Sequence, residues 1–373
     1  MDRRTFLGVA GAATTASLAG CSSAFETTAG RGPAVLDDRP DAVYMPTHRE
    51  GMEMVGMGMA GDLTVALMYS YPHRFWTIEN EGGEYVASRT EIQQDDAVHL
   101  MATVFHEPTG TVVPATGVST EVAQDGSLVS QETIYPMLSQ RMGFHYGANF
   151  PLEGDGTYDV TVSIGGMNST RFGAFEGLFG DAATATIPFE YSEAARNEIG
   201  YTLLEDEAGD PSALPPMEMG MMPTGDAPDP LPGQRIGEAT SGDARFVVQQ
   251  LSDARFLGDD DAGDTAADGG DESGTYVAVS AQTPYNRLVI PGMGLDMTVT
   301  SADGGNQRFD GRLDPGLDPE FGFHYGAVAD GLQPGDEIDL SVSTVPQVAR
   351  HEGYETAFLA MDSMALTVPE PSG

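Results

Sequence analysis

The chain has 373 residues, a length that favours two or three domains. It carries 57 acidic side chains against 17 basic ones, a formal net charge of −40, and every basic residue is arginine. A negative field of this strength repels nucleic acid and anionic lipid headgroups, so neither is an expected partner. The hydrophobic content of 40% is enough to build cores, so the acidic excess does not by itself indicate disorder.

The acidic surface without lysine is typical of a protein adapted to multimolar salt. At ~1 M salt the Debye length falls to ~3 Å, so repulsion between surface carboxylates is screened. The alternative is an acidic calcium-binding protein, but no Asp-x-Asp-x-Asp-Gly loop occurs in the chain. The composition therefore predicts a halophilic protein.

The N-terminus reads as an export signal. Arg3 and Arg4 precede a short apolar run over residues 9–18, which is typical of a twin-arginine signal peptide occupying residues 1–20. This run is too short for a membrane-spanning helix, which needs ~20 apolar residues. The pattern predicts an exported protein that folds before it is transported.

The single cysteine of the chain follows this signal. Cys21 stands behind Leu18-Ala19-Gly20, as in a lipoprotein-processing site, so we expect it to become a lipidated mature N-terminus at the outer face of the cytoplasmic membrane. A buried free thiol is the alternative. Residues 21–40 show no periodicity and are expected to form a flexible tether. With one cysteine there is no disulfide framework and no Cys-based zinc site.

The chain contains an internal repeat. The sequence FHYGA at residues 144–148 recurs at 323–327, each time after a glycine. The segment 156–163 is similar to the segment 335–343. We interpret this as two copies of one domain, over 41–200 and 243–370. Residues 201–242 are rich in Pro, Gly and acid and are expected to be a linker. An Asp/Gly/Ala stretch at 258–274 is expected to be a solvated loop in copy two.

Both copies show the pattern of β-strands. Apolar residues alternate at Leu63-Val65-Leu67 and over 158–164, and again over 295–299 and 338–342 in copy two, with Gly- and Pro-containing turns between them. No long stretch has helical periodicity. The predicted fold class is all-β, with two tandem immunoglobulin-like antiparallel sandwiches.

Methionines form two unusual groups. Residues 52–59 place four thioethers in eight positions, and 217–222 place four in six. Thioethers are soft ligands that suit Cu(I) and can share a site with imidazole. The alternative is that these methionines fill gaps in a core or a mobile surface. Met57 and Met59 are the candidates retained from the first group, because the second group stands in the expected linker.

Histidines supply further candidates. His145 and His324 lie in the repeated motif, where each is either a metal ligand held by packing or a core histidine that fixes a turn. His73 has Ala254 in the matching place of copy two, so any role is particular to copy one. His99 and His106 are seven residues apart on or beside a strand, and we expect them to face opposite sides and not to share one site.

Catalytic motifs are missing from the sequence. There is no Gly-x-Ser-x-Gly, phosphate loop, His-Glu-x-x-His or dinucleotide fingerprint. A blue-copper site needs a cysteine ligand, and Cys21 is assigned to lipidation. The chain is therefore not expected to be an enzyme.

Three segments of copy one resemble a known family. They are YPMLS at 135–139, GFHYGAN at 143–149 and GTYDV at 156–160. Together they resemble the periplasmic high-affinity iron-transport proteins, over about residues 52–191. The resemblance implies an immunoglobulin-like sandwich that binds copper and iron through Met, His and Glu, usually at a dimer interface. It leaves a homodimer open for this chain.

The resemblance also implies particular ligands. Met137 and His145 fall on ligand positions of the family. Its His-x-Glu pair should fall near Thr64 and Ala66, which cannot replace it, and its last histidine has no counterpart around residues 165–168. In copy two Gly316 stands where the methionine is required, so we expect that copy to bind metal weakly or not at all.

The sequence thus predicts an exported lipoprotein that binds iron or copper and passes it to a membrane-embedded transporter. The expected metal ligands are Met137 and His145, with His73, Met57 and Met59 completing the site. The alternative is a non-catalytic cell-surface module that keeps the fold without the metal site.

Overall fold

The structure, a computed structural model, describes residues 34–114, 116–218, 220, 222–257 and 274–370. The signal segment with Arg3 and Arg4, the lipidation residue Cys21 and most of the acidic stretch 258–274 lie outside the described residues. Within the described ranges, no helix has both the length and the apolar character needed to cross a bilayer.

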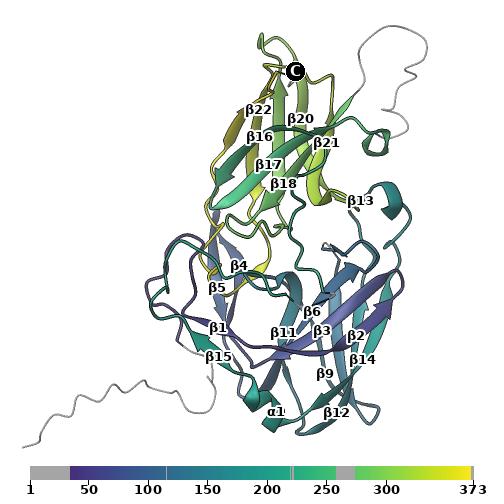
Figure 1. The fold of residues 1–373 in the computed structure, drawn as a ribbon, viewed down its shortest axis with the longest axis vertical. Coiled ribbons are helices and arrows are strands. Elements are labelled where there is room, and N and C mark those ends of the chain that lie inside the picture. The colour runs from purple at the N-terminus through teal and green to yellow at the C-terminus, as the bar shows by residue number, and fades with distance from the viewer. Residues whose placement is uncertain (1–33, 115, 219, 221, 258–273, 371–373) are drawn as a thin grey trace, which may run out of the picture.

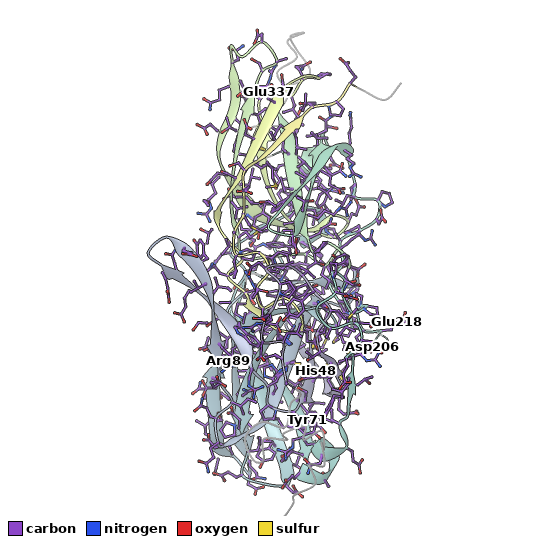
Figure 2. The ribbon with its side chains drawn as sticks, turned by 90° about the vertical axis from the view of Figure 1, so that its left-hand side faces the viewer. His48, Tyr71, Arg89, Asp206, Glu218 and Glu337 are labelled. Carbon is purple, nitrogen blue, oxygen red and sulfur yellow. The ribbon has the colours of Figure 1, made fainter. Side chains whose placement is uncertain are left out.

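The described chain is almost entirely β-structure, which confirms the predicted fold class. Two immunoglobulin-like antiparallel sandwiches lie one above the other along the long axis, the first in purple and teal and the second in green and yellow (Figure 1). Figure 2 shows the same arrangement from the side, with His48 in the first sandwich and Glu337 near the far tip of the second. The helical segments are α1 (Glu193–Glu198), η1 (Gly173–Phe175) and η2 (Ala254–Phe256).

The first sandwich has two layers. One layer has the order β2-β3-β6-β11-β10-β23-β4-β5, with β7 beside β6, and the other has the order β14-β12-β8-β9. A separate pair, β1 and β15, lies across it. The strands are β1 (His48–Glu50), β2 (Glu53–Ala60), β3 (Leu63–Ser70), β4 (Phe75–Glu81), β5 (Glu84–Thr90), β6 (Asp96–His106), β7 (Thr111–Val112), β8 (Val118–Gln124), β9 (Ser127–Thr133), β10 (Tyr135–Ser139), β11 (Gly143–Pro151), β12 (Gly156–Ile164), β14 (Ala183–Tyr191), β15 (Tyr201–Leu203) and β23 (Ala349–Arg350).

The second sandwich is one sheet that folds over itself, in the order β16-β17-β18-β21-β20-β19-β22-β24, with β13 beside β20. Leu366 of β24 comes close to Gly237 of β16, so the two ends of the sheet approach each other. The strands are β13 (Thr170–Arg171), β16 (Gln234–Ser241), β17 (Ala244–Leu251), β18 (Thr275–Gln282), β19 (Gly294–Thr300), β20 (Gln307–Asp318), β21 (Gly322–Ala329), β22 (Glu337–Thr344) and β24 (Met364–Thr367).

The sequence repeat corresponds to a repeat of topology. The order β2-β3-β6-β11-β10 in the first sandwich is matched by β16-β17-β18-β21-β20 in the second, and β14-β12-β8 is matched by β24-β22-β19. The expected linker, residues 201–242, is partly structured. Within it β15 pairs with β1, and β16 forms an edge of the second sheet.

Each sandwich gives a short strand to the other. β23, from the C-terminal part of the chain, pairs in parallel with β10 of the first sandwich. β13, from the first half of the chain, pairs in parallel with β20 of the second. These are the two parallel pairings among the described strands, and they join the sandwiches at their shared end.

The layer that contains β11 is buried on both faces. Phe144, Tyr146 and Phe150 of β11 belong to the main hydrophobic core, whereas His145 alternates to the other face and is also fully buried. Strand β12 shows the simpler pattern of one buried and one exposed face. Burial of the second face of β11 creates an interior that is lined by polar side chains.

Candidate metal-binding site

The hairpin of β10 and β11 places the two main predicted ligands side by side. Met137 and His145 are direct cross-strand partners, so their side chains share one face of the sheet. The turn between the strands ends at Gly143, whose φ of +66° is a conformation that glycine adopts readily. A Cβ there would lie 1.9 Å from the carbonyl oxygen of Thr224, so no other residue fits.

Four histidines meet on this face, and with Met137 they are here called the histidine cluster. The ring centroids of His73 and His99 are 4.0 Å apart, and those of His73 and His351 are 4.9 Å apart. His351 also lies 5.6 Å from His145. All four rings are buried. The cluster joins side chains of β6, β10 and β11 to the residue that precedes Arg74 and to the residue that follows β23.

The Nδ1 atoms of three of these rings have partners. The Asn149 side-chain oxygen lies 2.8 Å from His99 Nδ1, and the carbonyl oxygen of Gly143 lies 3.0 Å from His145 Nδ1. Glu50 lies 2.9 Å from His73 Nδ1. Such contacts fix the orientation of an imidazole and leave its other nitrogen free, as the partners of metal-binding histidines usually do.

The opposite nitrogens of the same rings have none. The Nε2 atoms of His73, His99 and His145, and both ring nitrogens of His351, are buried and have no hydrogen-bond partner among the described residues. A buried polar group left unpaired costs about 1–3 kcal/mol. Several of them in one place, beside a thioether, form a donor set that fits a transition-metal ion.

A glycine keeps the space between two of these donors open. A Cβ on Gly147 would lie 2.8 Å from His99 Nε2 and 3.0 Å from the Met137 sulfur. Both distances are too short for a carbon atom without a shift of its neighbours. Gly147 belongs to the FHYGA motif, so the motif supplies both a donor and the room beside it.

Burial keeps most of the cluster neutral. It lowers the pKa of His145 to about 4 and holds the pKa of His99 and of His351 well below the ordinary value. Neutral imidazole is the form that binds metal, so these rings are ready to bind near pH 7 without losing a proton.

His73 differs because of its carboxylate partner. Burial lowers its pKa, but the charge and hydrogen bond of Glu50 outweigh burial and raise it. Burial in turn raises the pKa of Glu50, and His73 and His48 outweigh it and hold that pKa well below the usual range. Glu352 is also buried, and its pKa is raised by burial first and by Glu50 second. Two buried carboxyl groups whose pKa values are shifted in opposite directions thus stand beside the rings.

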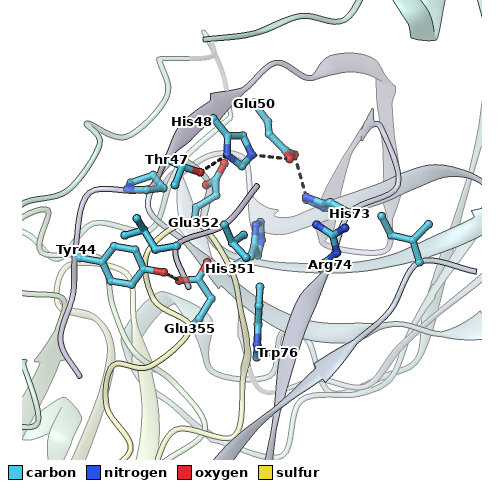
Figure 3. A pocket seen from close by; sticks show the side chains of 14 residues that line it. Tyr44, Thr47, His48, Glu50, His73, Arg74, Trp76, His351, Glu352 and Glu355 are labelled. Carbon is cyan, nitrogen blue, oxygen red and sulfur yellow. Dashed lines mark hydrogen bonds and ion pairs between the residues drawn. The ribbon is translucent and has the colours of Figure 1, made fainter. Parts of the chain in front are cut away.

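A small pocket leads to the cluster from the surface. It holds about 40 Å³ and is lined by His48, Glu50, His73 and His351 together with Trp76 and the acidic side chains that follow β23 (Figure 3). Figure 3 shows the chain of contacts from Thr47 through His48 and Glu50 to His73. The volume accommodates an ion or a few waters but no larger substrate.

The rings pack edge to face and do not point at one centre. Among the described residues, no three His, Cys, Asp or Glu side chains already hold the geometry of a metal site. Binding of an ion would therefore require rotations of these rings. Methionine is outside that set of residue types, so the finding does not bear on the Met137 sulfur.

The second sandwich shows what the same position looks like without free donors. His324 has the same Nδ1 contact of 3.0 Å, to the carbonyl oxygen of Gly322, but its Nε2 lies 3.2 Å from the Tyr276 hydroxyl. By strand register Tyr276 takes the place of His99, and Gly316 takes the place of Met137. His324 is a core histidine with both nitrogens satisfied.

The remaining predicted residues lie elsewhere. Met57 and Met59 are on β2, the edge strand, with β3 and β6 between it and β11, and their side chains are 37% and 60% exposed. The structure does not bring them to the cluster, because β2 pairs at the edge of the layer. His106 contacts Phe175 and Thr109, away from His99, as expected from their odd spacing.

The sequence did not indicate His351 as a candidate. His99 was considered only together with His106, so it was not a candidate ligand in its own right. A His-x-Glu pair was also overlooked. That pair is His48-Arg49-Glu50 on β1, and its Glu50 contacts His73, whereas Thr64 and Ala66 lie on β3. A signal for His351 exists in the repeat. The pattern Arg-x-x-x-aromatic-Glu-x-x-Phe occurs at 171–179 and again at 350–358, at the same offset as the two FHYGA motifs.

Comparisons with known proteins agree with this division of the chain. Residues 56–201 match the model of a family described as Fe2+ transport protein, which confirms the family resemblance for the first sandwich. Residues 229–367 match a domain of unknown function, DUF7350. No curated protein matches the chain.

Two similar solved structures contain copper. A copper-bound variant of FetP from uropathogenic Escherichia coli is 22% identical, with 38% of this chain and 97% of that chain covered and a TM-score of 0.28. A copper-bound variant of Campylobacter jejuni P19 is 21% identical, with 38% and 98% covered and a TM-score of 0.29. TM-scores of this size support no conclusion about function.

Proposed function

We propose that this protein binds a transition-metal ion, iron or copper, in the first sandwich and takes part in metal uptake at the cell surface. The observation that carries the proposal is the set of buried ring nitrogens without partners beside the Met137 sulfur. Imidazole suits copper and iron, and a thioether favours the softer Cu(I). The ligands proposed within the first sandwich are Met137, His73, His99 and His145, with Glu50 positioning His73.

The wider setting is also a proposal. The arginine pair and Cys21 support an exported, lipid-anchored protein, and the match to a family of Fe2+ transport proteins supports a non-catalytic role in delivering the ion to a membrane-embedded transporter. A protein tethered at the outer face of the membrane is well placed for such a transfer.

The test is titration of the full chain with Cu²⁺ and with Fe²⁺ at high salt, together with metal analysis. We expect one equivalent to bind, and we expect the double variant Met137→Ala, His145→Ala to lose stoichiometric binding. The matched control is Met59→Ala, His106→Ala, which removes one Met and one His outside the cluster. Equal binding by both double variants would refute the ligand assignment.

The alternative function is a cell-surface binding or structural module without metal. The observation in its favour is that the rings pack against one another and no three of the described His, Cys, Asp or Glu side chains converge. Absence of stoichiometric binding by the unaltered chain would overturn the metal proposal and favour this alternative.

A further inference from the structure

The residue after β23 stands among the first sandwich's histidines although it comes from the second half of the chain. His351 is buried, its ring lies 4.9 Å from His73 and 5.6 Å from His145, and both of its nitrogens lack partners among the described residues. We propose that the second sandwich supplies His351 as a ligand, so that the two domains together form one metal site. This inference rests on the proposed function.

The strand pairing explains how His351 is placed. Ala349 pairs with Met137 and Arg350 pairs with Leu138, so the next residue continues along β10 toward the cluster. On its other side Arg350 pairs with Trp76 of β4. β23 is therefore held between two strands of the first sandwich, and this pairing keeps the backbone of His351 beside the cluster.

Further contacts fix the segment that follows. The Tyr44 hydroxyl donates to Glu355 at 2.6 Å, and the Tyr44 backbone N–H donates to the carbonyl oxygen of Gly353 at 3.1 Å. Arg350 is fully buried and donates to the carbonyl oxygens of Pro346 and Ala357. Specific hydrogen bonds thus hold this segment against the first sandwich.

The reciprocal exchange in the second sandwich is an internal comparison. β13 pairs with β20 in the same parallel register, with Thr170 opposite Gly316 and Arg171 opposite Leu317. The residue that follows is Phe172, whose ring stacks on His324 with the same 5.6 Å between centroids. Phe172 is the counterpart of His351, and Gly173 and Glu352 share a φ near +55°.

The two exchanges therefore share their strand register and the 5.6 Å between ring centroids, but they differ in ring angle, 25° against 82°, and in chemistry. In the second sandwich the residue contributed by the other domain is Phe172, whose apolar ring packs on His324, a histidine with both nitrogens hydrogen-bonded. In the first sandwich it is His351, an imidazole whose unpaired nitrogens lie beside the unpaired ring nitrogens of other histidines. Packing alone requires only a ring in this place, as Phe172 shows. The imidazole at His351 supplies donor atoms that packing does not need.

The test uses the full chain with His351→Phe, because phenylalanine already fits the equivalent place. We expect the affinity for Cu²⁺ to fall about tenfold or more, because loss of a residue that only supports a ligand already costs about 10–100-fold. The thermal midpoint of the ion-free protein should change little. The matched control is Phe172→His, which makes the opposite change in the second sandwich and should leave the affinity unaltered.

Electron paramagnetic resonance of the Cu²⁺-loaded proteins gives a second readout. We expect one nitrogen fewer in the His351→Phe spectrum than in that of the unaltered chain. Full affinity and an unchanged spectrum in His351→Phe, while Met137→Ala, His145→Ala abolishes binding, would overturn the inference and keep the proposed function. Absence of binding by the unaltered chain would overturn both.

Discussion

At the scale of single residues, the candidate site depends on what is missing as much as on what is present. Gly147 carries no side chain, and its place lies between His99 Nε2 and the Met137 sulfur. The same glycine in the second sandwich, Gly326, makes room for the Tyr276 ring. One motif therefore serves a donor set in one copy and aromatic packing in the other.

A methyl group at this place tests the argument. Gly147→Ala puts a carbon within 3.0 Å of two donors, so we expect weaker binding of Cu²⁺ by about tenfold or more. The comparison variant is Gly117→Ala, since a Cβ on Gly117 meets open space. Isothermal titration of both variants measures the difference, and equal affinities would show that the space beside Gly147 is not the ion's place.

His324 supports a prediction about pH. Burial lowers its pKa to about 4, whereas the unfolded chain binds the same proton near 6.5. The unfolded state therefore takes up more protons between these values, so stability that is complete above pH 6.5 falls as the pH drops toward 4. His324→Phe removes this contribution.

The measurement is denaturant unfolding at pH 7 and at pH 5. We expect the free energy of unfolding of His324→Phe to fall less between these pH values than that of the unaltered chain. Some fall should remain, because His145 is buried in the same way. An identical fall in both proteins would contradict the assignment of a neutral, buried His324.

Some of the candidate ligands could be predicted from the sequence. The repeated FHYGA motif made His145 a candidate ligand, and the family resemblance made Met137 one. The structure places both in one short hairpin. His351 is 206 positions from His145 and has no local motif, and it joins the site only through a two-residue parallel strand. Pairings of that length leave no hydrophobic period in a sequence.

At the scale of elements, the two short parallel strands explain why the fold was predicted better than its assembly. Alternation of apolar residues predicted strands such as β12, whose one exposed face gives a clean pattern. The layer with β3 and β11 is buried on both faces, so its strands lack this alternation. Strand β1, which carries His48 and Glu50, has only three residues and is too short to show a pattern. Sequence patterns predicted the sandwiches and gave no sign of the segments exchanged between them.

The segment after β23 provides a test of this exchange. Tyr44→Phe removes the hydroxyl that donates to the buried Glu355, so we expect a loss of about 1–3 kcal/mol in stability. Hydrogen exchange should speed up over residues 350–357. The control is Tyr285→Phe, because that ring is largely exposed. Unchanged exchange over 350–357 would show that Tyr44 does not hold this segment.

At the scale of the whole molecule, we expect the charge of −40 to make the stability of the fold depend on salt. Repulsion among carboxylates acts over ~10 Å at 0.1 M salt and over ~3 Å at 1 M. We expect the thermal midpoint to rise as KCl increases through this range. The comparison is sucrose, which strengthens burial without screening charge. A midpoint that is independent of KCl would contradict adaptation to salt.

The presence of two sandwiches in one chain affects what can be expected of its oligomeric state. The first sandwich receives β23 and the second receives β13, so within this chain each copy already has a partner for its shared end. The described residues of one chain already bury His99 and His145 fully and leave only 8% of His73 and 4% of His351 exposed, so burial of the histidine cluster does not need a homodimer.

The X-ray absorption spectrum of the full chain loaded with one equivalent of copper tests directly whether the histidine cluster binds the ion. We expect imidazole scattering from several histidines together with one sulfur, because Met137 stands beside the rings and no other sulfur among the described residues lies in the cluster. A spectrum with oxygen ligands alone, without imidazole or sulfur, would contradict this expectation.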